Sequence, residues 1–307
     1  MDVVTSLSTW LRGCLSGFGI ITREFPEACQ IPLKEWTNSG LKSLVRNYGD
    51  IFDVVNDQIL FLLRKIEGSL LALPWWLVIL LIVMVAWHAS RSRWLAVGLA
   101  LSLIIIGMFE LWDDTMRTLA IMLIATTITV LIGIPIGILM ASSKYIQAAI
   151  NPILDGMQTM PSFVYLIPVV FFFGLGNVAA IFAIFIYAVP PMIRLTNLGI
   201  RLVDAQVVEA AEAFGATSSQ ILWGVRLPLA MPTLLAGVNQ AIMMALAMAV
   251  IASMIGARGL GAQVLRGLNN GNVGMGLEAG LAIVVLAVIL DRITASYGRR
   301  LDYSQTA

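Results

Sequence analysis

Charged residues are scarce in this sequence. Only 12% of its 307 residues are Asp, Glu, Lys or Arg, while 59% are hydrophobic. A soluble domain carries about 25% charged residues, so half that content indicates an all-α integral membrane protein with several spans. The formal net charge is +1, and this near balance gives no reason to expect a nucleic-acid partner.

Groups for metal or nucleotide chemistry are also few. The single histidine, His88, lies at the end of an apolar run, and a metal site needs more ligands than that. No Gly-x-x-x-x-Gly-Lys-Ser/Thr occurs, so the chain cannot bind ATP through a P-loop. The glycines of 256–261 reverse the dinucleotide-binding spacing and follow an apolar run, which indicates an extracytoplasmic turn. No nucleophile–base pair stands out, so an enzyme is not expected.

The amino-terminal region holds both cysteines, Cys14 and Cys29. They could form a disulfide if this region is exported, or remain two free thiols. Asp2 precedes any basic residue and Arg12 interrupts the apolar run, so no cleavable signal peptide is predicted. The pattern of residues 1–39 indicates no function.

Residues 40–67 have apolar side chains at three- and four-residue steps, with charges mostly on the other face. This periodicity predicts an amphipathic helix that is too charged to span a bilayer. We expect it to lie along the membrane interface or against the bundle. A helix of a small soluble domain is the alternative.

Long apolar runs dominate the rest of the chain. A transmembrane helix needs about 20 apolar residues, and seven runs are interpreted as spans: 69–88, 94–111, 118–141, 151–173, 178–198, 229–255 and 277–295. Kinked helices are expected in the fourth and fifth spans because of their prolines. Gly133 and Gly137 in the third span would let two helix backbones approach closely, although chance is an equal alternative.

Basic residues set the expected orientation. If the spans alternate, one side receives Arg91, Arg93, Lys144, Arg194, Arg201, Arg292, Arg299 and Arg300. Positive residues mark the cytoplasm, so the amino terminus is expected outside and the carboxyl terminus inside. The polar stretch 204–228 then lies in the cytoplasm. Arg117, Arg258 and Arg266 lie on the outer side and are exceptions to the rule that positive residues mark the cytoplasm.

The stretch 204–228 has the signals of two short helices joined by a turn. Asp204 is a good N-cap for a helix over 205–214, and Gly215 is placed to end it. Thr217 with Gln220 is a capping-box pattern, which predicts a second helix to about residue 226. Leu227-Pro228 is expected to end the stretch.

This stretch resembles the EAA loop of ABC-importer permeases, and we call it the EAA loop. The resemblance is carried by Glu209-Ala210-Ala211, the glycine four residues later, and Leu227-Pro228 before a long apolar run. The segments 158–168, 250–261 and 278–293 are similar to the glycine betaine/proline betaine/choline branch of that family. The similarity covers roughly residues 110–296.

The resemblance implies the type I ABC importer permease fold in a bacterial inner membrane. It divides the chain into an amino-terminal region (1–68), two peripheral spans (69–112), a permease core (113–297) and a cytoplasmic tail (298–307). It implies no cofactor on this chain, since ATP and magnesium would bind a separate ATPase subunit. The implied partners are a second permease copy, two ATPase subunits, an extracytoplasmic binding protein and a betaine-like osmolyte.

The resemblance also assigns roles within the EAA loop. Val207, Ala211 and Phe214 would fill a groove in the ATPase. Glu209 and Glu212 would pair with basic residues at the rim of that groove, and Gly215 would permit the turn. The predicted coupling residues are Glu209, Ala210, Ala211, Glu212, Phe214, Gly215, Leu227 and Pro228.

Candidates for a translocation pathway come from the later spans. Aromatic faces attract quaternary ammonium groups, which suggests Tyr165 and Tyr187, although ordinary packing is the alternative. Asn239 and Gln240 lie near mid-membrane, where amides bridge helices or face a wet cavity; one is expected to bridge. Met243 belongs to a methionine-rich span that suits a shifting interface or plain core packing.

Two other classes of transport protein remain as alternatives. An ion-coupled secondary transporter would use ionisable residues inside the membrane, and the later spans have only Asp155, Glu278 and Asp291, all near their ends. An osmotic channel would conduct without a partner.

Overall fold

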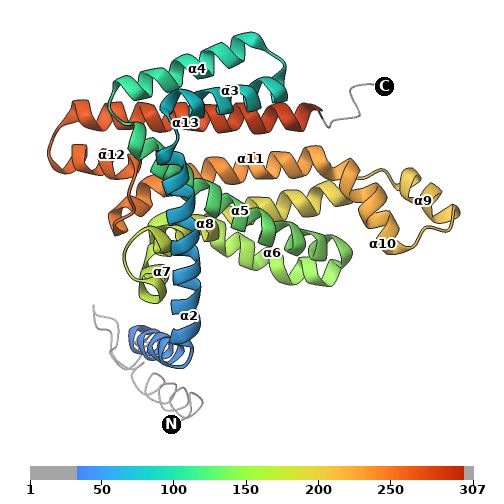
Figure 1. Ribbon diagram of the computed structural model, residues 1–307. Helices are drawn as coiled ribbons and strands as arrows, with labels where there is room; N and C mark the ends of the chain where they lie inside the picture. Colours follow the sequence, from blue (N-terminus) through green and yellow to red (C-terminus); the bar gives the residue numbers. More distant parts are fainter. Residues whose placement is uncertain (1–32, 301–307) are drawn as a thin grey trace, which may run out of the picture. The chain divides into compact units, whose positions relative to one another are not determined.

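The computed structural model describes residues 33–300. The cysteines at 14 and 29, the extreme amino terminus and residues 301–307 of the predicted tail lie outside the described residues. The described chain divides after Asp53 into two compact units. The unit from Val54 onward holds every site discussed below (Figure 1).

The first described element is α2 (Leu33–Ala72), one helix of 40 residues. It confirms the predicted amphipathic helix and extends it at both ends. Beyond Val54 its apolar face packs on the core, where Leu63 is fully buried.

Two predicted spans are wrong as continuous helices. The predicted span 69–88 is broken, because α2 ends at Ala72 and α3 (Trp75–Ser90) begins after Pro74. The span 151–173 consists of α6 (Lys144–Thr159), the 3₁₀ turn η2 (Ser162–Tyr165) and α7 (Leu166–Phe173), with a bend of 109°. In both cases a proline supplies no N–H and pushes its neighbour out of the helical region, so the chain turns instead of kinking.

The remaining elements are helices of unequal length. They are α4 (Arg93–Met108), α5 (Trp112–Ser142), α8 (Asn177–Arg201), α9 (Ala205–Ala213), α10 (Ser218–Ile221), α11 (Leu227–Ala252), α12 (Leu260–Asn269) and α13 (Val273–Arg300). The turn predicted at 256–261 leads directly into a helix, α12, which begins at Leu260. Three residues of the predicted tail, 298–300, belong to α13.

Within the described residues, four helical runs are long and apolar enough to cross a membrane. The number rises to at most six if each of two bent pairs crosses as one span. The predicted number of seven is therefore not confirmed, partly because α4 is a short apolar helix of 16 residues.

The core is built around α8, which packs against α5 on one side and α11 on the other (Figure 1). A Cβ added at Gly133 would lie 2.7 Å from Met192 Cγ, and one at Gly137 would lie 2.5 Å from Thr196 Cβ. Both glycines therefore allow α5 to pack closely against α8, and the alternative that their spacing arose by chance is not supported.

Candidate functional site

The first helix of the EAA loop is held by its caps. Asp204 accepts a hydrogen bond from the Gln206 amide at 2.9 Å. At the other end Gly215 has φ +82° and donates to Glu212 O at 2.9 Å, while Ala216 N donates to Ala211 O at 3.1 Å. This pair of bonds is a Schellman motif, which satisfies terminal carbonyls and needs a left-handed residue. The predicted cap and stop are confirmed.

The second helix of the loop begins with the predicted capping box. Gln220 N donates to Thr217 Oγ1 at 3.4 Å, and Thr217 N donates to Gln220 Oε1 at 2.8 Å. The capping box is therefore confirmed, and it fixes where α10 starts.

The predicted boundary at Leu227-Pro228 is confirmed as the start of α11, but the chain stays helical across it. A π-helical turn, η3 (Leu222–Arg226), follows α10, and Leu227 N donates to Leu222 O. Such a turn bonds each N–H to the fifth residue back, and Pro228 falls in the first turn of α11, where its missing N–H is tolerated. Ser218–Ile255 is thus one helical run of 38 residues.

The apolar side chains of the loop divide between two faces. Val208 is 8% exposed and lines a hollow together with Ala141 and Ile200, whereas Phe214 is 93% exposed and Val207 is also exposed. Ala211 is half-buried. Sequence reasoning missed Trp223, which is 67% exposed on the following turn; a tryptophan within a polar stretch was the available signal.

The two glutamates of the loop line a hollow of about 390 Å³. Glu209 and Glu212 share this hollow with Arg201 and Arg226. Arg201 is held in place, since its Nε donates to Asn197 Oδ1 at 2.9 Å and its Nη2 donates to Met140 O at 2.8 Å. The hollow is open, so the two carboxylates can also reach a docking partner.

The pathway candidates do not form one site in the chain. Tyr165 and Tyr187 lie edge to face with ring centroids 6.1 Å apart, and Tyr165 is buried with its hydroxyl donating to Met157 O. Gln240 and Met243 are exposed on α11. The first pair therefore belongs to the core, and the second pair faces outward.

Asn239 is the amide that bridges helices. Its Nδ2 donates to Asp291 Oδ1 at 2.8 Å, and Thr294 Oγ1 donates to Asn239 Oδ1 at 3.1 Å. Asn239 thus links α11 to α13, and the expectation that one of the two amides bridges is confirmed.

Replacing Asn239 with Leu should destabilise the protein, because the Asp291 carboxylate would lose its donor. We expect the free energy of unfolding to fall by about 1.5–3 kcal/mol, the usual contribution of a hydrogen bond to a charged group, since this bond is part-buried. Thermal unfolding of the purified chain measures it, and Gln240→Leu on the exposed face is the matched control. Equal unfolding temperatures for the two variants would contradict the bridge.

Sequence reasoning also missed an ion pair between α6 and α8. Arg194 Nη2 donates to Asp155 Oδ1, and both side chains are partly exposed. Charged side chains within membrane segments pair with one another and face protein or water. The α6–α8 face that carries this pair is therefore unlike a lipid-facing surface.

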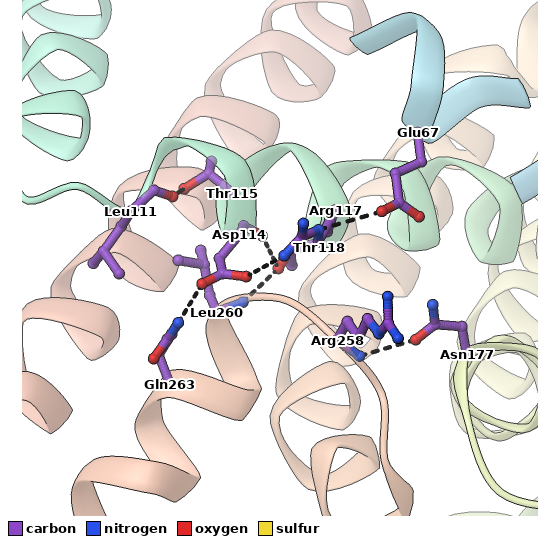
Figure 2. A network of polar contacts seen from close by, with 10 residues as sticks. All are labelled: Glu67, Leu111, Asp114, Thr115, Arg117, Thr118, Asn177, Arg258, Leu260 and Gln263. Atoms are coloured by element: carbon purple, nitrogen blue, oxygen red, sulfur yellow. Dashed lines mark hydrogen bonds and ion pairs between the residues drawn. The ribbon is translucent and has the colours of Figure 1, made fainter. Parts of the chain in front are cut away.

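A second polar network joins the start of α5 to the start of α12 (Figure 2). Thr118 Oγ1 accepts from the Leu260 amide at 2.9 Å, and Asp114 accepts from Gln263 Nε2. Arg117 pairs with Asp114 at 3.2 Å and with Glu67 at 3.3 Å.

Gly259 lies against this network with φ +120°. A Cβ at this position would lie 2.4 Å from Thr118 Oγ1. The glycines around 256–261 therefore build a tight junction between helices, in agreement with rejecting a nucleotide loop.

Residues 133–303 match the family described as the binding-protein-dependent transport system inner membrane component. The chain belongs to this family. The matched residues include the whole EAA loop and α11. We refer to the chain below as the permease.

Named relatives support the same assignment. The permease is 44% identical over 269 residues to the glycine betaine/proline betaine transport system permease protein ProW of Escherichia coli K12, covering 88% of this chain and 76% of the relative. It is 42% identical over 278 residues to the glycine betaine/carnitine transport permease protein GbuB of Listeria monocytogenes, covering 90% and 98%.

A solved structure supports the fold. The MetNI methionine ABC transporter in an inward-facing conformation matches 60% of this chain and 92% of the solved chain, with a TM-score of 0.56 at 22% identity. The type I ABC importer permease fold is therefore confirmed. Membership places the permease in the inner membrane, implies an ATPase and a binding protein as partners, and agrees with the expectation that it is not an enzyme.

Proposed function

We propose that the permease moves a quaternary-ammonium or methylamine osmolyte, such as glycine betaine, proline betaine or choline, into the cell. Relatives named for glycine betaine with proline betaine or carnitine are more than 40% identical to it. The observation that carries the importer mechanism is the EAA loop, which has an exposed apolar tip and runs without a break into α11.

In the proposed assembly two copies of the permease pair, and each binds one ATPase subunit that hydrolyses ATP with magnesium. An extracytoplasmic binding protein delivers the osmolyte. Phe214 and Val207 enter a groove of the ATPase, a helix-in-groove contact, while Glu209 and Glu212 meet basic residues at its rim. Ala210 and Ala211 keep α9 slim, since neither has a side chain beyond Cβ.

The proposed orientation puts the amino terminus outside and the carboxyl terminus in the cytoplasm. In Figure 1 the α3–α4 turn, the α5–α6 turn and the carboxyl end of α13 lie at the same end of the helices as the EAA loop. Basic residues gather at that end, in accord with the positive-inside rule. A fluorescent tag at the carboxyl terminus that reports the outer face would overturn this orientation.

Transport would follow from the connection between the loop and α11. When the ATPase subunits close, they move the two EAA loops together, and Leu227 and Pro228 carry the movement into α11. Gln240 and Met243 lie exposed on that helix, so we place them, rather than Asn239, on the pathway. Tyr165 and Tyr187 are proposed to shape the wall behind it.

The experiment is uptake by the reconstituted complex in proteoliposomes. With ATP enclosed in the vesicles, the ATPase subunits on the inner face, and the binding protein and labelled glycine betaine outside, the label should accumulate inside. A non-hydrolysable ATP analogue in place of ATP should abolish accumulation. A panel of unlabelled methylamines tests the substrate class by competition. Accumulation driven by an ion gradient without ATP, or single-channel currents from the permease alone, would favour the alternatives instead.

A further inference from the structure

Four arginines gather at the end of the bundle where α3, α4 and α13 meet. Arg91 and Arg93 flank the α3–α4 turn, and Arg299 and Arg300 end α13. They line two adjoining hollows of about 430 and 320 Å³, and Arg91 and Arg300 belong to both. Figure 1 shows this turn beside the carboxyl end of α13.

No carboxylate balances this cluster within the described part of the chain. All four arginines are exposed, and none forms an ion pair there. The sequence has no acid between Glu67 and Glu110, and the acids nearest in sequence to Arg299 and Arg300 are Asp291 and Asp302, of which Asp302 lies outside the described residues. Like charges held this close repel one another, so the cluster favours an anion from outside the described residues.

The backbone at Arg91 points to the same conclusion. Arg91 has φ +52° and ends α3, with its N–H donating to Trp87 O at 2.8 Å. Glycine or asparagine usually occupies this left-handed position after a helix. An arginine is strained there, which we attribute to a requirement for its side chain.

The surroundings place the cluster at a membrane surface. Trp87 and Trp94 lie on either side of the turn and are 54% and 88% exposed. Tryptophans of this kind mark the level of the lipid headgroups. Arg300 Nη1 donates to His88 O at 2.6 Å, which joins α13 to α3 and leaves its other N–H groups for a ligand.

We propose that this cluster binds the phosphodiester headgroup of an anionic phospholipid. Guanidinium groups match phosphate oxygens in bidentate geometry, and basic pockets between membrane helices bind anionic headgroups. The proposal rests on membership in a membrane family and on these residues, and it is independent of the transported solute.

The test is lipid binding to the purified full-length permease in detergent, followed by native mass spectrometry. Phosphatidylglycerol should be retained over phosphatidylcholine. Each arginine removed should weaken retention about fivefold, so Arg91→Gln/Arg300→Gln should lose about 25-fold. The second double variant, Arg93→Gln/Arg299→Gln, should weaken lipid retention by a similar factor. It allows the proposal to be tested even if the first double variant does not fold.

Two controls separate a site from a general charge effect. Lys65→Gln/Lys144→Gln removes two exposed cations elsewhere and should leave retention unchanged, whereas Arg91→Lys/Arg300→Lys should keep most of it. Equal retention of the two lipids would overturn the proposal. An equal loss of retention in Arg91→Gln/Arg300→Gln and in Lys65→Gln/Lys144→Gln would overturn it as well. Inorganic phosphate at matched ionic strength should not displace the lipid; displacement with the same arginine dependence would identify a free-anion site instead.

Discussion

Gly215→Val should abolish transport while the protein remains in the membrane. Gly215 has φ +82°, and nothing lies within 4 Å of an added Cβ. The expected defect is therefore one of backbone conformation and not of steric clash. A β-branched residue is strongly disfavoured at positive φ, at a cost of about 1–3 kcal/mol, so the turn should open and misdirect Phe214. We expect ATP-dependent uptake to fall by about a hundredfold, which corresponds to two steps of 1.4 kcal/mol in coupling.

Gly215→Asn is the matched control, because asparagine tolerates the left-handed region. It should keep most of the uptake, and both variants should reach wild-type levels in the membrane. The ATPase of the Gly215→Val complex should no longer respond to substrate. Normal uptake by Gly215→Val at wild-type abundance would contradict the role assigned to the turn.

Phe214→Ala should weaken binding of the ATPase subunit by about 30- to 1,000-fold. Phe214 is 93% exposed at the end of α9, and Val207 and Trp223 of the same loop are exposed as well. Several large apolar side chains exposed on one polar loop favour a docking surface. An aromatic anchor at the centre of an interface contributes about 2–4 kcal/mol when truncated to Ala. Surface plasmon resonance with the permease in nanodiscs and soluble ATPase subunits measures this change.

Trp94→Ala provides the comparison, since Trp94 is similarly exposed but lies on α4, away from the EAA loop. Its affinity for the ATPase should match wild type. If the Phe214→Ala variant binds the ATPase subunit with wild-type affinity, the Phe214 side chain does not contribute to ATPase binding. Trp223→Ala should then be tested, because Trp223 is the other large apolar side chain exposed nearby.

Local signals in the sequence predicted the EAA loop well. The Asp204 cap, the Gly215 stop and the Thr217–Gln220 box are each made by residues within six positions of one another, so predicting them required no knowledge of distant contacts. The family of the chain could also be predicted, because the motif of the EAA loop and the apolar runs can be recognised in the sequence itself. Coupling roles for these residues stay a prediction.

Long-range geometry was less accessible. A proline inside an apolar run can kink a helix or end it, and the chain bends by 105° at the break that holds Pro74 and by 109° at the break that holds Pro161. The continuation through Pro228 depends on a π-helical turn that leaves no clear mark on apolar periodicity. The Asp155–Arg194 pair joins residues 39 apart and the Asn239–Asp291 bond joins residues 52 apart, and pairing at such separation is not encoded in local spacing.

The run Ser218–Ile255 is helical without a break, although α10 turns away from the axis of α11 (Figure 1). The 26 residues of α11 extend about 39 Å at 1.5 Å per residue. A tilt of α11 by about ten degrees about its midpoint displaces each of its ends by about 3 Å at that length. Coupling between two binding sites is reciprocal. If ATP binding to the ATPase subunit changes the affinity for osmolyte at the other end of α11, osmolyte binding should change the affinity of the ATPase for ATP by the same factor.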